Sequence, residues 1–261
     1  MTAPELFGLT GRTALVVGAA GGIGRWLVAG LLAADANVVA SDLDRGALER
    51  LRADLDGLGE GRLHLVAADL AVETAAVEIV DRTVAAAGQL DVLVNAAAIN
   101  VRRPLRDVDL ETYRRIMAVD LDAAFFLSQA AVEPMIEQGR GAIITVSSVN
   151  AMQGIETVGV YGPAKAALVQ LTKVMAVEWS HLGIRANAIA PGFVDTPLTE
   201  ALQADERRYS WLMQRIPMRR LARPSEFVGA LLLLASDAGS YLNGTTLTVD
   251  GGFLAGSRWD A

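Results

Sequence analysis

The sequence predicts an α/β fold: a doubly wound parallel sheet of about seven strands with helices on both faces, in a single domain over residues 1–261. Short runs of apolar and β-branched residues alternate with longer segments that have helical spacing, and this alternation is typical of parallel sheets with right-handed crossovers. A glycine-rich turn follows the first apolar run, at residues 18–24. A chain of 261 residues with 52% hydrophobic content is long enough to bury one core of this kind.

Each predicted strand is a short apolar run that ends at glycine, proline or a polar residue. These runs are 13–17, 37–42, 63–70, 92–95, 142–146, 185–191 and 245–249. Helical spacing is present at 23–34, 110–135, 161–181 and 226–235, and Pro163 is compatible with the first turn of the third of these helices. The charged stretch 198–224 fits no buried strand. We expect residues 193–224 to form a helical segment that covers a substrate site.

The composition excludes several classes of function. A formal charge of -7 argues against nucleic acid or an anionic membrane surface as a partner. The absence of cysteine rules out a thiol nucleophile or a thiolate metal site, and His64 and His181 lie too far apart in sequence to suggest a metal centre. The N-terminus lacks a leader pattern, and no run of 18 apolar residues occurs. We therefore expect a cytoplasmic protein without a metal.

The glycine turn predicts a site for a dinucleotide. Gly18, Gly22 and Gly24 follow a strand and lead into the helix that begins near Ile23. Without Cβ atoms, glycines permit a tight turn and close approach of the backbone to a pyrophosphate, whose charge is met by N–H groups at the helix N-terminus. The turn therefore indicates a Rossmann-type domain.

An acid at the end of the second predicted strand indicates which dinucleotide binds. Asp42 follows the glycines by about 20 residues, where a carboxylate can accept both ribose hydroxyl groups of NAD. The same carboxylate would repel the 2′-phosphate of NADP, and the neighbours Ser41 and Leu43 are neutral. The expected cofactor is NAD. The alternative is that Asp42 only caps the following helix.

Tyr161 and Lys165 are the candidate acid–base pair. Side chains four residues apart share one face of a helix, and a nearby cation favours the phenolate and lowers the pKa of a tyrosine. Ser148 precedes Tyr161 by thirteen residues and follows an apolar run. The plainer alternative is a half-buried tyrosine beside a solvated lysine, although the chain contains only one other lysine, Lys173.

Together, these motifs resemble the short-chain dehydrogenase/reductase family over about residues 10–252. Residues 100–105 and 217–224 look most like its gluconate 5-dehydrogenase and 2-deoxygluconate 3-dehydrogenase branch. The resemblance implies an NAD-dependent oxidoreductase that moves a hydride between a secondary alcohol or its ketone and nicotinamide. It also implies a homotetramer built through helices 110–135 and 161–181 and the last helix and strand, where the apolar run 231–234 is longer than one buried face needs.

The resemblance assigns roles to further residues. Tyr161 exchanges a proton with the substrate oxygen, Ser148 hydrogen-bonds that oxygen, and Lys165 tunes the phenol and binds the nicotinamide ribose. Asp120 stands where the family has an asparagine that holds a water near the lysine, so it adds a negative charge there. The implied catalytic set is Ser148, Tyr161, Lys165 and Asp120. The implied cofactor contacts are Gly18, Gly22, Ile23, Gly24, Asp42, Leu43, Asp69, Leu70, Asn95, Tyr161, Lys165, Pro191, Gly192, Val194 and Thr196.

Polar residues flank the catalytic set and indicate a polar substrate, such as a sugar, a sugar acid or a polyol. A steroid or long acyl chain would leave these groups unpaired, whereas a polyhydroxylated molecule would satisfy them. Arg102 or Arg103 could hold a carboxylate through paired hydrogen bonds, or both could be solvated at a tetramer edge. The candidate substrate residues are Asn100, Arg102, Arg103, Asn150, Gln153 and Glu156.

Three other functions are compatible with parts of this pattern. The first is a ketoreductase of 3-oxoacyl or other apolar carbonyl substrates. The second is a catalytically silent dinucleotide-binding protein, against which the intact Ser148, Tyr161 and Lys165 set argues. The third is an enoyl reductase, which the short spacing between Tyr161 and Lys165 disfavours.

Overall fold

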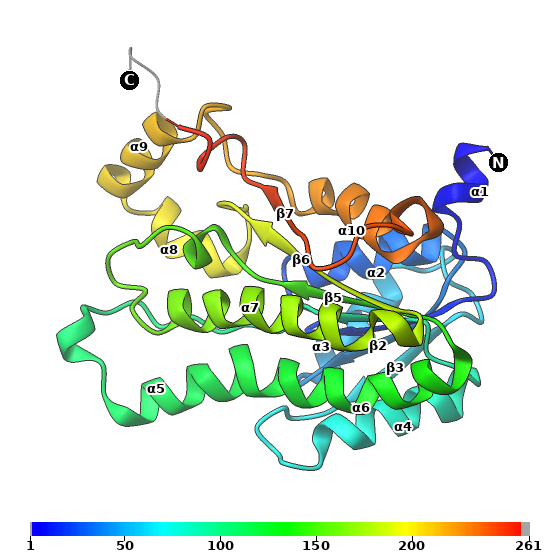
Figure 1. Ribbon diagram of the computed structural model, residues 1–261. Helices are drawn as coiled ribbons and strands as arrows, with labels where there is room; N and C mark the ends of the chain where they lie inside the picture. The colour runs from blue at the N-terminus through cyan, green and yellow to red at the C-terminus, as the bar shows by residue number, and fades with distance from the viewer. Residues whose placement is uncertain (1, 257–261) are drawn as a thin grey trace.

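A seven-stranded parallel sheet forms the centre of the computed structural model, which describes residues 2–256 (Figure 1). The strand order is β3-β2-β1-β4-β5-β6-β7, so the order reverses between β1 and β4, as in a doubly wound sheet. The predicted fold class is confirmed. The strands are β1 (Thr13–Val17), β2 (Asn37–Asp42), β3 (Leu63–Ala67), β4 (Val92–Asn95), β5 (Gly141–Val146), β6 (Ile184–Pro191) and β7 (Thr246–Val249).

Helices cover both faces of this sheet, because successive strand residues point to opposite sides and both sides are apolar. One face, with Val16, packs against α2 (Gly24–Ala33), α3 (Arg45–Asp54) and α10 (Val228–Ala235). The other face, with Leu15, packs against α4 (Ala75–Ala87), α6 (Ala123–Gln138) and α7 (Tyr161–Trp179). The remaining elements are α1 (Ala3–Phe7), α5 (Leu110–Met117), α8 (Glu200–Gln203), α9 (Glu206–Arg215) and the short segments η1 (Leu105–Asp107), η2 (Ala118–Asp122), η3 (Val149–Ala151), η4 (Ser180–Leu182), η5 (Pro197–Thr199), η6 (Pro224–Phe227) and η7 (Asp237–Gly239).

The long helix predicted at 110–135 contains one irregular turn. α5 continues through η2, a π-helical turn, into α6, which ends where Gly139 adopts a left-handed conformation with φ of 68°. A π turn holds one more residue than an α turn, and such turns are frequent at functional sites. Asp120 lies in this turn and is buried.

The segment after β6 contains helices, as its charge pattern predicts. η5, α8 and α9 follow one another between Pro197 and Arg215 and lie beyond the carboxyl end of β6 (Figure 1). Ligands of open parallel sheets bind at this edge. Within the described residues, no helix is long and apolar enough to cross a membrane.

Candidate active site

The glycine turn has no room for side chains. Gly18 has a φ of 79°, and a Cβ on it would stand 2.6 Å from the backbone nitrogen of Ala97. A Cβ on Gly24 would stand 2.0 Å from the carbonyl oxygen of Gly18, and one on Gly22 would stand 2.5 Å from Cγ2 of Thr196. The turn thus lies tightly against the end of β4 and against the segment after β6. Such a turn lets a ligand approach the backbone at the start of α2.

A cavity of about 320 Å³ opens beside this turn. It brings together residues from the ends of β1, β4, β5 and β6, which are far apart in the sequence. Most of the predicted cofactor contacts and three of the four catalytic candidates line it. The lining residues are Gly18, Ala20, Gly21, Gly22, Ile23, Gly24, Ala96, Ala98, Val146, Ser147, Ser148, Tyr161, Lys165, Pro191, Gly192, Val194, Thr196, Pro197, Leu198 and Thr199.

Asp42 is tied to the glycine turn and not to the helix that follows it. One carboxylate oxygen accepts a hydrogen bond from the backbone N–H of Ala20 at 3.0 Å, and the other accepts one from Leu43 at 2.8 Å. The cap of α3 is Asp44, whose side chain accepts from the N–H of Ala47 at 3.1 Å. The alternative role for Asp42 as a helix cap is therefore wrong. Each carboxylate oxygen keeps a further lone pair for another donor.

The other predicted adenosine contacts stand at the same sheet edge but do not line the cavity. Leu43 is exposed after β2, while Asp69 and Leu70 follow β3, with the Asp69 carboxylate accepting from the N–H of Ala71 at 2.9 Å. Asn95 is buried at the end of β4 and donates to Oγ of Ser128 at 3.2 Å. Its own side-chain oxygen has no hydrogen-bond partner among the described residues, so an acceptor is free there.

Ser148, Tyr161 and Lys165 converge at one end of this cavity. Tyr161 is the first residue of α7, and Ser148 stands before η3, where its hydroxyl accepts from the N–H of Asn150 at 3.1 Å. The Lys165 ammonium lies 5.5 Å from the centre of the Tyr161 ring and donates to the carbonyl of Val146 at 3.3 Å. Lys165 is only 1% exposed, so the alternative of a solvated lysine is wrong.

Asp120 forms a buried ion pair with Lys165. Its Oδ2 lies 3.7 Å from the lysine Nζ, and its Oδ1 accepts from the N–H of Ile99 at 2.7 Å. Burial raises the pKa of Asp120, and the charge of Lys165 opposes this. Burial lowers the pKa of Lys165, and the charge of Asp120 opposes that shift in turn. The negative charge of Asp120 thus favours the ammonium form of Lys165. The asparagine that the family has at this position is neutral and lacks this effect.

The expected lowering of the Tyr161 pKa is wrong for this arrangement. The pKa of the phenol is raised, first because the residue is buried and second because the charge of Asp120 disfavours a phenolate. The hydroxyl of Ser148 and the charge of Arg102 act in the opposite direction but more weakly. The sequence prediction counted the nearby lysine and omitted burial and the carboxylate that accompanies the lysine.

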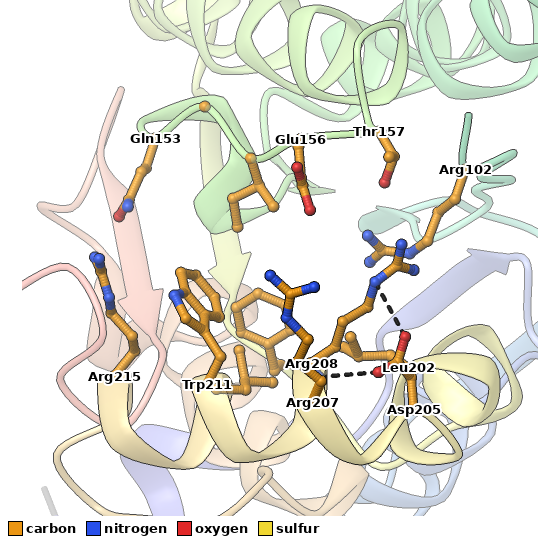
Figure 2. A pocket seen from close by; sticks show the side chains of 14 residues that line it. Arg102, Gln153, Glu156, Thr157, Leu202, Asp205, Arg207, Arg208, Trp211 and Arg215 are labelled. Carbon is orange, nitrogen blue, oxygen red and sulfur yellow. Dashed lines mark hydrogen bonds and ion pairs between the residues drawn. The ribbon is translucent and has the colours of Figure 1, made fainter. Parts of the chain in front are cut away.

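A second cavity, of about 720 Å³, lies between the loop after η3 and helices α8 and α9 (Figure 2). Of the predicted substrate residues it includes Arg102, Gln153 and Glu156. It also includes Arg207, Arg208 and Arg215 of α9, which were not among the predicted substrate residues. Their spacing of three or four residues from Trp211 was the signal in the sequence that could have identified them. The lining residues are Arg102, Gln153, Gly154, Ile155, Glu156, Thr157, Phe193, Leu202, Asp205, Arg207, Arg208, Trp211, Leu212 and Arg215.

The remaining predicted substrate residues are not in this cavity. Arg103 forms an ion pair with Asp109, and its backbone N–H donates to Thr157 at 3.0 Å. The side-chain oxygens of Asn100 and Asn150 are buried and have no hydrogen-bond partner among residues 2–256. Arg102 and Arg103 therefore point to different surroundings despite being adjacent.

Known proteins resemble this chain over nearly its whole length. The family model described as "Enoyl-(Acyl carrier protein) reductase" matches residues 18–254. Gluconate 5-dehydrogenase of Gluconobacter oxydans is 35% identical over 97% of this chain and 98% of its own length. Cis-4-hydroxycyclohexanecarboxylate dehydrogenase of Sinomonas cyclohexanicum is 40% identical over 94% of this chain and 97% of its own. A crystal structure of a gluconate 5-dehydrogenase from Burkholderia cenocepacia, in complex with NADP and tartrate, has a TM-score of 0.91 at 35% identity and covers 98% and 100% of the two chains.

The doubly wound sheet, its glycine turn and these relatives define an oxidoreductase that acts on alcohol groups with a nicotinamide dinucleotide. The chain belongs to the short-chain dehydrogenase/reductase family.

Proposed function

We propose that the protein is an NAD-dependent oxidoreductase that moves a hydride between nicotinamide and the secondary alcohol or ketone of a polar sugar, sugar acid or polyol. The observation that carries this proposal is that one cavity is lined both by the glycine turn and by Ser148, Tyr161 and Lys165. A binding site and a proton-transfer group thus face the same space. A catalytically silent dinucleotide-binding protein would not need a tyrosine and a lysine buried together there.

The residues of the cavity fit a dinucleotide. A Cβ at Gly18 or Gly24 would collide with the backbone and one at Gly22 with the Thr196 side chain, so glycine is needed for this tight turn. N–H groups at the start of α2 can then meet a pyrophosphate. Pro191, Gly192, Val194 and Thr196 also line the cavity and would hold the nicotinamide end. Asp69 and Leu70 would lie at the adenine end. The bound nicotinamide supplies the acceptor or donor of the hydride.

The protein's own groups handle the proton. In alcohol oxidation, the ionised oxygen of Tyr161 takes the substrate O–H proton while the hydrogen of the adjacent C–H leaves as hydride; in reduction, the neutral phenol gives its proton to the carbonyl oxygen. Ser148 donates a hydrogen bond to that oxygen. Lys165 holds positive charge near the phenol ring and would bind the nicotinamide ribose. The charge of Asp120 favours the ammonium form of Lys165 and opposes the lowering of its pKa by burial.

The proposal of NAD over NADP rests on Asp42. Its carboxylate lies at the edge of the glycine turn, held by Ala20 and Leu43, where the adenosine ribose of a bound cofactor belongs. A 2′-phosphate would bring like charges together at this position. The relative from Burkholderia cenocepacia was crystallised with NADP, so the two cofactors must be compared directly.

The proposal of a polar substrate rests on the second cavity. Arg102, Gln153 and Glu156 line it, and an apolar substrate would leave such groups unpaired at about 1–3 kcal/mol each. Two relatives carry the name gluconate 5-dehydrogenase, which agrees with a polyhydroxylated acid. Residues 193–224, which include α8 and α9, would cover this substrate.

The test combines each of two cofactors with five groups of substrates: polyols, sugar acids, apolar secondary alcohols, 3-oxoacyl thioesters and enoyl thioesters. The reaction is followed by absorbance at 340 nm. We expect turnover with NAD and with polyols or sugar acids, and weak turnover with apolar secondary alcohols or 3-oxoacyl thioesters. Reduction of an enoyl thioester would instead support the activity for which the family model is named. Binding of NADH without turnover of any substrate would indicate the silent binding protein.

A further inference from the structure

The second cavity has more positive than negative charge. Four guanidinium groups line it: Arg102 from the segment after β4, and Arg207, Arg208 and Arg215 from α9 (Figure 2). Only two carboxylates, Asp205 and Glu156, accompany them, and Asp205 is already ion-paired to Arg208 at 3.3 Å. An unbalanced cationic cavity favours an anionic ligand, because each guanidinium is always ionised at neutral pH.

One pair of these arginines, Arg102 and Arg208, lies at one end of the cavity (Figure 2). Figure 2 shows the side chains of Arg102 and Asp205 on the same side of the cavity, and Asp205 is bound to Arg208. Burial and then the charge of Arg208 lower the pKa of Arg102, while Tyr161 raises it. Arg102 therefore lies within electrostatic reach of both another guanidinium and the proposed catalytic phenol. No ion pair of Arg102 with a carboxylate is present among residues 2–256.

A second cationic position lies along the same helix. Arg208, Trp211 and Arg215 stand three and seven residues apart, so they share one face of α9, and the two arginine backbones are separated by about 10 Å along the axis. The Arg215 guanidinium lies 4.9 Å from the Trp211 ring centre, which fixes its orientation. In Figure 2 it lies opposite Gln153, at the other end of the cavity from Arg102.

We propose that the preferred substrate of this site is a dianion with two separate carboxylates, one bound between Arg102 and Arg208 and the other bound by Arg215. This inference rests on the proposed function and narrows its substrate class. Planar guanidinium groups bind carboxylates through paired hydrogen bonds, and two such groups at the two ends of a cavity select a molecule charged at both ends. A phosphate ester is also a dianion, but its charge is concentrated at one end.

The first experiment compares kcat/KM for substrates matched in stereochemistry. Gluconate and glucarate form one pair, and galactonate and galactarate form another; sorbitol 6-phosphate, a polyol whose only charged group is a phosphate at one end, is the phosphate ester for comparison. We expect at least one dicarboxylate to exceed its matched monocarboxylate by about tenfold or more, the usual range for a charge-assisted hydrogen bond. Equal values in both pairs, or a preference for the phosphate ester, would overturn the inference.

The second experiment removes one charge at a time. Arg215→Gln should lower kcat/KM for the dicarboxylate about tenfold more than for its matched monocarboxylate, mostly through KM. Arg102→Gln should lower kcat/KM for both substrates, because in both a carboxylate binds between Arg102 and Arg208. Arg103→Gln is the matched control, since Arg103 is adjacent in sequence but ion-paired to Asp109 outside the cavity. An Arg215→Gln variant with the same substrate ratio as the unaltered protein would contradict the second anion position.

A binding measurement separates this inference from the proposed function. Calorimetry can give the dissociation constants of glucarate and gluconate for the protein with NADH, without any turnover. Tighter binding of glucarate that is lost in Arg215→Gln supports the dianion site even if the protein oxidises neither compound. Turnover of polyols with equal binding of both acids supports the proposed function and rejects the dianion site.

Discussion

Tyr161 lies where both burial and a neighbouring carboxylate oppose ionisation of its phenol. Its raised pKa makes the free phenol a stable proton donor at neutral pH. Tyr161→Phe keeps the ring that packs at the start of α7 and removes only the oxygen. We expect turnover to fall by at least about 10²–10⁴-fold, the usual contribution of acid–base catalysis. NADH binding, followed by fluorescence titration, should stay the same; substantial turnover by the variant would place the proton transfer on another group.

Asp120 gives a prediction about pH. Its negative charge raises the pKa of both Tyr161 and Lys165, so Asp120→Asn should lower both values. In alcohol oxidation, activity needs the phenol to release its proton and the lysine to keep its own. Both limbs of the rate profile should therefore move to lower pH. The measurement is kcat/KM against pH for the unaltered protein and the variant.

The control for this profile is Asp122→Asn, because Asp122 is exposed in the same π-helical turn. Its profile should match that of the unaltered protein. If the Asp120→Asn profile is also unchanged, the carboxylate does not influence the proton-transfer groups.

Asp42 gives a prediction about cofactor choice. Replacing it by alanine, together with Leu43→Arg, removes the charge that would repel a 2′-phosphate and adds one that attracts it. The ratio of kcat/KM for NAD to that for NADP should fall below the value for the unaltered protein. Because Asp42 also accepts from the N–H groups of Ala20 and Leu43, some loss with NAD is expected as well. Equal use of NAD and NADP by the unaltered protein would remove the basis of the prediction.

The π-helical turn η2 places the Asp120 side chain next to Lys165. The turn inserts an extra residue between α5 and α6 and buries the Asp120 side chain against Lys165 of α7. The sequence predicts a continuous helix here, because apolar spacing does not distinguish one widened turn from the regular turns around it. The sequence alone therefore does not predict that the Asp120 side chain lies beside Lys165.

The strands and most helices were predictable, since buried parallel strands are apolar runs and their helices have clear periodicity. β1 ends at Val17 and β2 at Asp42, as their patterns predict. The short helix α1 was not predicted, because five residues are too few to show a helical period. The separate surroundings of Arg102 and Arg103 were also hidden, since the pairing of Arg103 with Asp109 depends on the path of a loop.

The glycine turn should not tolerate a side chain at Gly24. Gly24→Ala would place a Cβ 2.0 Å from the Gly18 carbonyl oxygen, so the backbone of the turn would have to move. We expect a lower melting temperature and weaker NADH binding. Gly229→Ala, in helix α10, is the matched control, because a Cβ there meets no atom within 4 Å and alanine favours a helix by about 0.5–1 kcal/mol. Equal melting temperatures and equal NADH affinity for the two variants would mean that the turn tolerates a side chain.

The charge of the whole chain differs in sign from the charge of the second cavity. The chain has a net charge of -7, yet the second cavity is lined by four arginines. The overall charge supports solubility and disfavours nucleic acid, while the local field at the cavity attracts small anions. The net charge of the chain therefore argues against nucleic acid as a partner but does not predict the charge of the substrate.

The surface of the two long helices indicates self-association. Exposed apolar residues lie on the two long helices expected to form a tetramer interface: Phe126 on α6 is 52% exposed, and Val177 on α7 is 80% exposed. The last helix offers less apolar surface than its sequence indicates, because Leu231 and Leu234 are buried in the core of the chain itself. Exposed apolar side chains gathered on such helices are typical of an association surface.

We therefore expect a tetramer at micromolar concentration, measured by size-exclusion chromatography with light scattering. Val177→Glu would bury a charge at the helix interface and should shift the population to smaller species. Val77→Glu is the matched control, since Val77 is 55% exposed on α4, outside the expected interface, and should leave the mass unchanged. A monomeric unaltered protein would contradict the assembly itself, and a tetrameric Val177→Glu variant would move the interface away from α7.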